Sequence, residues 1–239
     1  MKAVILAAGK GTRLADLTKE RPKPMVDVGG KPCLERIIGA LSKASVTEMV
    51  IVTGYMAQAI ESYFGDGSKF GVTITYVNQK VQDGTGSAVH ITKDAVGKSS
   101  FLMTYGDIIM PEENYLGMVE FFHQNPCMAL MGVNWVNDPY KGAAVYFNDD
   151  NVVERIIEKP AQGTSTTNWN NAGIYVFNPV IYEYTAKLRL SQRGEYELPD
   201  AIQTMQKDGH LIRAYSLEGY WKDIGTPEDL KQAGKLFKA

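Results

Sequence analysis

The first half of the chain alternates between short apolar runs and stretches whose apolar residues recur at helical spacing. Short runs rich in apolar and β-branched residues predict β-strands over residues 2–6, 48–53, 72–77 and 101–105. Apolar side chains at positions 34, 37, 38 and 41 form one face of a helix, and further helices are predicted over 57–64, 85–95 and 114–123. This alternation predicts a mainly parallel sheet with helices on both faces.

The second half of the chain has a different pattern. Strands predicted over 129–136, 143–147, 152–157 and 173–177 are joined by tight polar turns, which is typical of antiparallel hairpins. A helix over 198–206 and a strand over 211–216 follow, and the last helix begins at Thr226 as N-cap, with Pro227 in its first turn. No linker or repeat divides the chain. We therefore expect one domain over residues 1–239, an α/β fold of three layers (α/β/α) around a mixed, predominantly parallel sheet.

Charge along the chain is uneven. The net charge is −2 and the pI is near 6.0, so the whole molecule has no bias toward nucleic acid or a membrane surface. Residues 1–31 hold seven basic and three acidic side chains, a net +4, so the rest of the chain carries −6. A local cationic segment on an acidic protein suits a small anionic substrate better than a long polyanion.

Cysteine usage and hydropathy limit the class of protein further. Cys33 and Cys127 form no CxxC pair, which argues against a disulfide framework and a zinc site. No apolar run reaches the length of about 18 residues that a membrane span needs. The apolar start of the chain ends at Ala8, so it is interpreted as a core strand rather than a signal peptide. We expect a cytoplasmic protein with no nucleic-acid or membrane partner.

The turn after the first strand is the strongest candidate for a binding site, because ligands of parallel α/β sheets bind beyond the carboxyl ends of the strands. Small residues let a ligand approach the backbone, and successive N–H groups in such a turn bind anions. The segment lacks the third glycine of a dinucleotide fingerprint and the Ser or Thr that follows the lysine of a P-loop. It predicts a phosphorylated ligand, with these contributors: Leu6, Ala7, Ala8, Gly9, Gly11, Thr12, Arg13 and Lys23.

Six segments in the same order resemble the signature of sugar-1-phosphate nucleotidylyltransferases, the nucleoside-diphospho-sugar pyrophosphorylases, with the glucose-1-phosphate thymidylyl- and uridylyltransferases most similar. They are LAAGKGTRL (6–14) with RPKPM (21–25), QKVQDGTGSA (79–88), YGD (105–107), EKP (158–160), NNAGIYVF (170–177) and WKDIGTPEDL (221–230). The resemblance spans nearly the whole chain and implies the nucleotide-diphospho-sugar transferase fold. Residues 1–125 would then bind the nucleotide and residues 126–239 the sugar phosphate.

The resemblance implies roles for the charged residues of these segments. Arg13 and Lys23 match the basic pair that holds the triphosphate, and we expect them to be catalytic. Asp107 and Asp223 match the aspartates that ligate the catalytic metal. Carboxylate oxygens are ligands that Mg2+ prefers, usually one or two beside phosphate oxygens and water. Mg2+ is therefore the expected cofactor.

Gln79 is the candidate reader of the base, together with the turn formed by Gly84 and Thr85. A carboxamide offers one donor and one acceptor, which complement the N3–H and O4 of uracil or thymine. Guanine offers two donors, which a glutamate would suit better. Gln82 remains an alternative for this role.

The sugar phosphate is expected to contact Glu158 and Lys159. A carboxylate accepts hydrogen bonds from sugar hydroxyls, and an ammonium group holds the phosphate. By resemblance, Gly142 and Asn171 are further sugar contacts.

The expected reaction transfers a nucleotidyl group from UTP or dTTP to a sugar-1-phosphate, with glucose-1-phosphate favoured, and releases pyrophosphate. Two alternatives stay open, namely a non-catalytic regulatory homologue that binds nucleotide and guanylyl transfer to mannose-1-phosphate. A related glycosyltransferase would show a D-x-D motif, and a dehydrogenase would need a glycine in place of Leu14. We expect no β-helix acyltransferase domain. Uridine versus thymidine, the sugar, and assembly into a homo-oligomer are left open.

Overall fold

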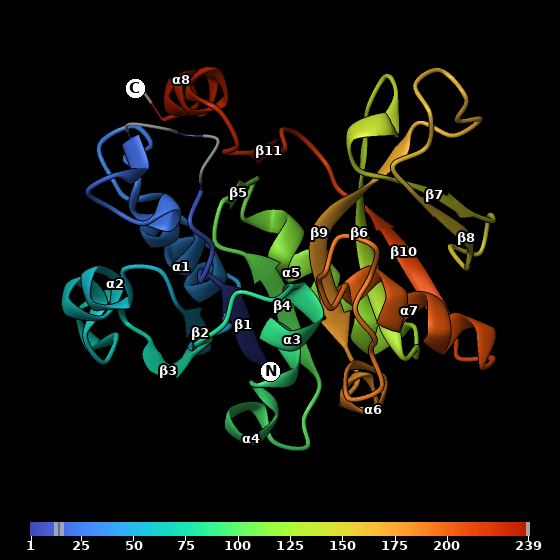
Figure 1. Cartoon of the computed structure of the whole chain (residues 1–239), viewed down its shortest axis with the longest axis horizontal. Coiled ribbons are helices and arrows are strands. Elements are labelled where there is room, and N and C mark those ends of the chain that lie inside the picture. The colour runs from blue at the N-terminus through green and yellow to red at the C-terminus, as the bar shows by residue number, and fades with distance from the viewer. Residues whose placement is uncertain (12–13, 15–16, 238–239) are drawn as a thin grey trace.

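The computed structural model describes residues 1–11, 14 and 17–237, and its centre is a mixed β-sheet (Figure 1). Within these residues the sheet has nine strands, seven of them in the order β10-β6-β9-β4-β1-β2-β3. Strands β1, β2, β3 and β4 are mutually parallel, β9 is antiparallel to both β4 and β6, and β7 pairs with β8 and β9. The strand bounds are β1 Lys2–Leu6, β2 Glu48–Thr53, β3 Thr73–Asn78, β4 Phe101–Tyr105, β6 Ala129–Trp135, β7 Ala143–Phe147, β8 Val153–Glu158, β9 Trp169–Phe177 and β10 Ile212–Ser216.

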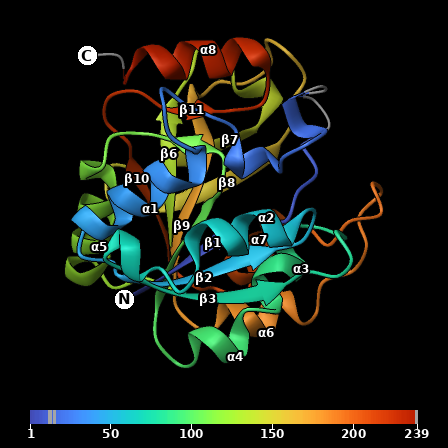
Figure 2. The ribbon, with the colours of Figure 1, turned by 90° about the vertical axis from the view of Figure 1, so that its left-hand side faces the viewer.

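Helices cover both faces of the sheet, as the alternating pattern predicts. One face packs against α1 Cys33–Lys43, α2 Ala57–Phe64, α5 Glu113–Gln124 and α8 Pro227–Lys235. The other packs against α3 Thr85–His90, α4 Lys93–Val96, α6 Ile181–Thr185 and α7 Leu198–Lys207. Figure 2 shows α1 and α8 above β2 and β3, with α4 and α6 below them. The three-layer α/β/α architecture is confirmed.

Strand β1 shows why a continuous apolar run is needed at the centre of such a sheet. Ala3 and Ile5 point into the core under α1, while Val4 points into the core on the opposite face. All three side chains are fully buried. Leu6 pairs with Val52 of β2 and with Tyr105 of β4, so these strands end at the same level. The loops that follow them therefore lie at one edge of the sheet.

Three features differ from the sequence prediction. The helix predicted over 85–95 is two helices, because the Thr92 hydroxyl bonds to the Val89 carbonyl oxygen and the chain turns there. Strand β9 begins four residues earlier than predicted, since its polar start pairs with β6, Asn170 lying opposite Asn134. The two-residue strands β5 Ile108–Ile109 and β11 Lys222–Asp223, which pair with each other, are too short to give a pattern.

The Thr226 cap is confirmed, since its hydroxyl oxygen accepts the Asp229 N–H at 3.2 Å.

Candidate active site

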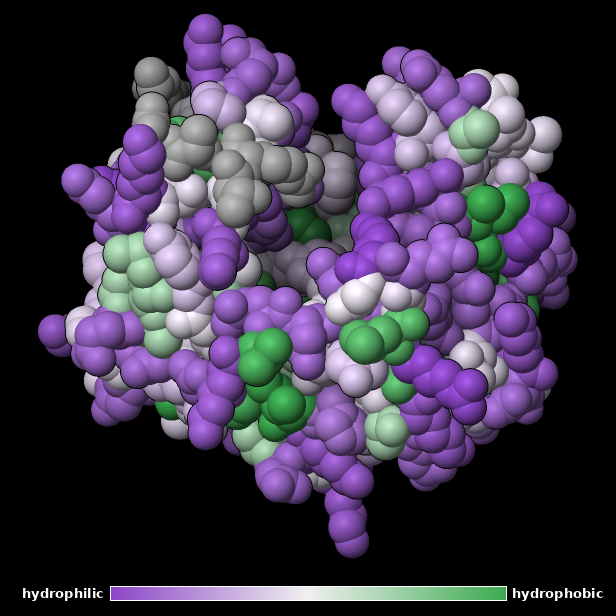
Figure 3. Space-filling view, in the orientation of Figure 1, coloured by the Kyte–Doolittle hydropathy of each residue, from purple (hydrophilic) through white to green (hydrophobic). Residues whose placement is uncertain are grey.

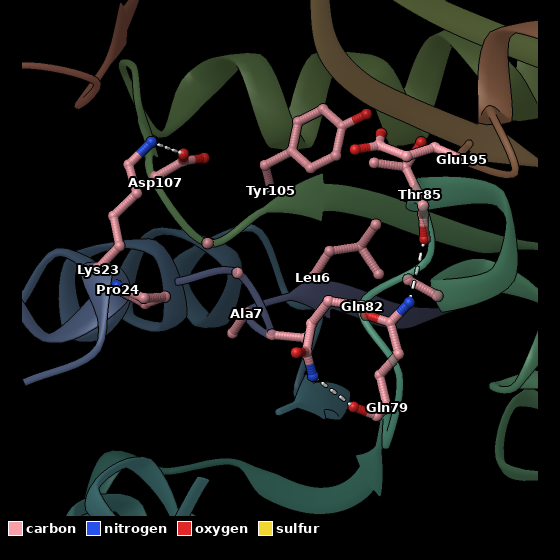
Figure 4. Close-up of a pocket in the computed structure, with 15 residues that line it drawn as sticks. Leu6, Ala7, Lys23, Pro24, Gln79, Gln82, Thr85, Tyr105, Asp107 and Glu195 are labelled. Carbon is pink, nitrogen blue, oxygen red and sulfur yellow. Dashed lines mark hydrogen bonds and ion pairs between the residues drawn. The ribbon is translucent and has the colours of Figure 1, made fainter. Parts of the chain in front are cut away.

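A cavity of about 230 Å³ lies at the carboxyl ends of β1 and β4, where the sequence places the binding turn (Figure 4). Figure 3 shows the same face of the molecule hollowed between the part that carries α8 and the part that carries β7 and β8. The cavity is lined by Leu6, Ala7, Ala8, Gly9, Lys23, Pro24, Gln79, Gln82, Gly84, Thr85, Ala88, Tyr105, Gly106, Asp107 and Glu195. Nine of the predicted site residues are among them, drawn from segments up to a hundred residues apart.

Gly11 positions the cationic side of this cavity although it does not line it. Its φ is +65°, and a Cβ added there would lie 2.6 Å from the Lys23 Cβ. The absence of a side chain at Gly11 therefore allows the segment that carries Lys23 to pack against the glycine-rich turn. Thr12 and Arg13, the other predicted phosphate contacts of this turn, lie outside the described residues.

Lys23 connects the two predicted metal ligands. Its ammonium group forms a short ion pair with Asp107 and a second one with Asp223, at 3.2 Å. Asp107 lies two residues after the end of β4 and immediately before β5, and Asp223 is placed beside it because β11 pairs with β5. The Trp221 indole fixes the chain before β11 by donating a hydrogen bond to the Ala172 carbonyl oxygen at 3.0 Å.

Burial and the mutual contacts of these three side chains shift the pKa values of Lys23 and Asp107. Burial lowers the pKa of Lys23, but the Asp107 and Asp223 carboxylates outweigh that effect, so its pKa is raised and the ammonium stays charged. Burial raises the pKa of Asp107; Lys23 opposes this rise and the Asp223 carboxylate adds to it. Within the described residues, the two carboxylates converge on the Lys23 ammonium group, and carboxylate oxygens are ligands that a divalent cation such as Mg2+ prefers.

The donor set fits Mg2+ rather than a protein-only metal cage. Among the residues that the structure describes, no three His, Cys, Asp or Glu side chains are grouped so as to hold a metal. Two carboxylates from the protein leave the remaining positions to phosphate oxygens and water, which is the common arrangement for Mg2+.

Gln79 lies at the other end of the cavity and is only 6% exposed. Its side-chain nitrogen donates to Ser87 Oγ at 2.9 Å and to the Gly84 carbonyl oxygen at 3.1 Å, with Asp83 Oδ1 at 3.4 Å. The donor half of the carboxamide is therefore used within the protein, which the sequence did not indicate. Gln82 supports the same loop, since its side-chain nitrogen donates to the Gln79 carbonyl oxygen at 2.8 Å.

A loop from the second half of the chain is fixed against the base-side loop, residues 79–84 between β3 and α3. The Tyr196 N–H donates to the Asp83 carbonyl oxygen at 2.7 Å, and the Gly86 N–H donates to the Tyr196 carbonyl oxygen at 2.8 Å. These bonds bring Glu195 to the cavity wall. Sequence reasoning missed Glu195 because it lies in an irregular segment with no periodic pattern.

Three of the predicted sugar-phosphate residues lie together on the β7–β8 hairpin. Glu158 pairs with Ala143, and the Lys159 N–H donates to the Gly142 carbonyl oxygen at 2.8 Å. Gly142 is tightly enclosed, since an added Cβ would lie 2.2 Å from Asn170 Oδ1. Burial is the main cause of the raised pKa of Glu158.

Asn171 and the hairpin residues do not line the cavity described above. The Asn171 side chain is bonded to the Tyr175 hydroxyl at 2.6 Å and, through its oxygen, to the Gly173 N–H at 3.1 Å. Tyr105, a cavity residue, occupies the space beside Gly173, where an added Cβ would lie 2.6 Å from its ring. Tyr105 therefore lies between the cavity and the strand that carries Asn171.

Comparisons with known proteins agree with this architecture. A model of the family described as nucleotidyl transferase matches residues 2–238. The low-salt glycan biosynthesis nucleotidyltransferase of Haloferax volcanii is 37% identical over 237 residues, 99% of this chain and 66% of that protein. The bifunctional protein GlmU of Methanocaldococcus jannaschii is 38% identical over 237 residues, 99% of this chain and 54% of that protein. Glucose-1-phosphate thymidylyltransferase of Streptomyces griseus is 34% identical over 236 residues, again 99% of this chain and 66% of that protein.

The chain thus spans between about half and two thirds of the length of these curated relatives. Among solved structures, UDP-glucose pyrophosphorylase in complex with UDP-glucose has a TM-score of 0.88 at 25% identity, covering 99% of this chain and 97% of that one. No helix in the described part of the chain is both long and apolar enough to cross a membrane.

Proposed function

Because the chain belongs to the nucleotidyl transferase family, we propose that it transfers a nucleotidyl group from a nucleoside triphosphate to a sugar-1-phosphate and releases pyrophosphate. UTP and dTTP are the proposed nucleotides, and glucose-1-phosphate is the proposed acceptor. The observation that carries the proposal is the Lys23–Asp107–Asp223 cluster at one end of a cavity whose other end holds Gln79. The names of two similar proteins, a glucose-1-phosphate thymidylyltransferase and a UDP-glucose pyrophosphorylase, support this choice of substrates.

The proposed chemistry is an in-line displacement at the α-phosphorus. An oxygen of the sugar phosphate attacks, and the bond to the pyrophosphate oxygen breaks. A phosphate monoester has a second pKa near 6, so the attacking group is already mostly dianionic at pH 7 and needs no general base. The barrier is the approach of two polyanions, and catalysis of this kind depends on positioning and charge stabilisation.

The residues of this chain divide that work by position. The turn Leu6–Gly9 and the base-side loop with Gln79 would orient the nucleotide, and Lys23 would hold negative charge near the reacting phosphate. Asp107 and Asp223 would hold Mg2+, which neutralises phosphate charge when it is bound. Glu158 and Lys159 are the proposed contacts for the sugar phosphate.

A panel of UTP, dTTP, GTP, CTP and ATP against several sugar-1-phosphates tests the proposal, with pyrophosphate release measured with Mg2+ and with excess EDTA. We expect release with UTP or dTTP that depends on both the sugar phosphate and Mg2+. Binding of nucleotide with no release in any pair would instead favour a regulatory homologue.

A further inference from the structure

The Gln79 carboxamide has only one chemically reasonable orientation in this structure. Its nitrogen faces an Asp83 carboxylate oxygen and the Gly84 carbonyl oxygen, which only accept hydrogen bonds. If the amide were turned over, its oxygen would face those two acceptors and make no bond. Ser87 is compatible with the same orientation, since its hydroxyl can donate to Asp83 or to the Gly84 carbonyl oxygen and its oxygen then accepts from Gln79.

The carboxamide oxygen is consequently the part of Gln79 that is available to a ligand. Figure 4 shows the side-chain nitrogen directed along its dashed hydrogen bond, with the oxygen on the side of Gln82 and the cavity. Within the described part of the chain, no residue donates a hydrogen bond to this oxygen, while the nitrogen has three acceptors for its two hydrogens. The Gln79 side chain therefore presents a buried acceptor, rather than a donor, to the cavity.

We propose that Asp83 and Ser87 are positioning residues that fix Gln79 as an acceptor, so that the cavity selects bases whose ring nitrogen carries a hydrogen. This inference rests on the proposed function, because it places the base beside Gln79. Uracil and thymine donate from N3–H at this edge, and guanine donates from N1–H. Cytosine and adenine carry a lone pair at the same ring nitrogen, which would leave two acceptors facing each other in a buried place.

In this arrangement Gln79 would contact one of the two hydrogen-bonding groups at this edge of uracil rather than both. With its nitrogen occupied, Gln79 supplies one hydrogen bond to the base, and Asp83 and Ser87 determine which one it is. If they are removed, the amide is held only by Gly84 and turns over more readily. The turned amide would donate to N3 of cytosine, so discrimination between uracil and cytosine should weaken.

The test measures equilibrium binding of UTP and of CTP by calorimetry, in wild type and in the variants Asp83→Ala and Ser87→Ala. Asp94→Ala is the matched control, because Asp94 is an exposed acid on the neighbouring helix α4. We expect wild type to bind UTP at least about tenfold more tightly than CTP, as one correctly paired group in a buried site provides. That ratio should fall about tenfold in Asp83→Ala and about threefold in Ser87→Ala, as expected for a charged and a neutral hydrogen-bond partner. The Asp94→Ala control should keep the wild-type ratio.

The ratio of UTP affinity to CTP affinity distinguishes positioning from a general loss of structure, because a general loss of structure would weaken the binding of both nucleotides to a similar extent. An unchanged ratio in Asp83→Ala, with UTP still bound, would overturn the proposal. Should that variant fail to fold, Ser87→Ala decides alone, since alanine is well tolerated in a helix. If wild type binds none of the nucleotides, the proposed function fails instead, and the two failures are therefore distinguishable.

Discussion

Replacing Lys23 by methionine removes an ammonium group that both predicted metal ligands contact, while keeping a side chain of similar length. The Lys23 side chain is only 11% exposed, so water does not substitute for it easily. A preorganised charged group directed at developing charge contributes about 10²–10³ in kcat, or about 3–4 kcal/mol. We therefore expect kcat/KM for pyrophosphate release to fall at least about 100-fold.

The expected effect on folding is smaller. Asp107 loses the Lys23 ammonium group, which opposes the rise in the pKa of Asp107 that burial causes, so this carboxyl should bind a proton more readily in the variant than in wild type. Asp223 is 38% exposed and keeps contact with water. We expect a loss of about 1–3 kcal/mol in the free energy of unfolding, as for a buried group left without a partner. Thermal unfolding measures this loss.

Lys80→Met is the control, because Lys80 is exposed beside the base-side loop and carries the same charge. It should keep activity within about twofold of wild type, as surface substitutions usually have little effect. A folded Lys23→Met variant with kcat/KM within tenfold of wild type would refute the role assigned to this lysine.

Two further predictions concern Gly84 in the cavity wall and Glu158 on the β7–β8 hairpin. Gly84→Ala should lower the thermal midpoint and raise KM for the nucleotide, because Gly84 has a φ of +129° and an added Cβ would lie 2.4 Å from the Tyr196 carbonyl oxygen. Gly97→Ala is its control, with a φ of +79° and no atom within 4 Å, so it should show the backbone strain alone, about 1–3 kcal/mol. Glu158→Gln should reduce the fall in the free energy of unfolding as pH rises, because the variant has no carboxyl group at this position to lose a proton. The raised pKa of Glu158 means that the folded state binds its proton more tightly than the unfolded state, so stability is fully present below the ordinary pKa of 4.5 and declines above it. Urea unfolding of wild type and of Glu158→Gln from pH 4 to 8 measures the free energy of unfolding. If it changed with pH in the same way in both proteins, the raised pKa of Glu158 would be contradicted.

The parallel part of the fold could be predicted from the sequence because its strands are buried on both faces. Val4 and Ile5 must both be apolar when helices cover each side of β1, and such runs are visible without any structure. The start of β9 could not be predicted in this way. Asn170 and Asn171 carry hydrogen-bonding side chains whose partners, Asn134 and Tyr175, are fixed only by the folded chain.

The residues of the candidate site likewise include some that could be predicted from local sequence and some that could not. The turn Leu6–Gly9 is local in sequence, so its chemistry could be predicted from its composition and its place after a strand. Asp223 could be assigned only through resemblance, since nothing near it in sequence indicates that it meets Lys23. The orientation of the Gln79 amide depends on Asp83, Gly84 and Ser87 in three dimensions, and no spacing rule contains it.

The contacts of Lys23 have a consequence for how the protein is made. Its two carboxylate partners follow it by 84 and 200 residues. During synthesis the chain emerges from its N-terminus, so Lys23 and Asp107 are present long before Asp223 is added. A chain synthesised as far as residue 221 contains every residue that lines the cavity, yet it lacks half of the carboxylate pair. We expect such a product to bind nucleotide without turning it over.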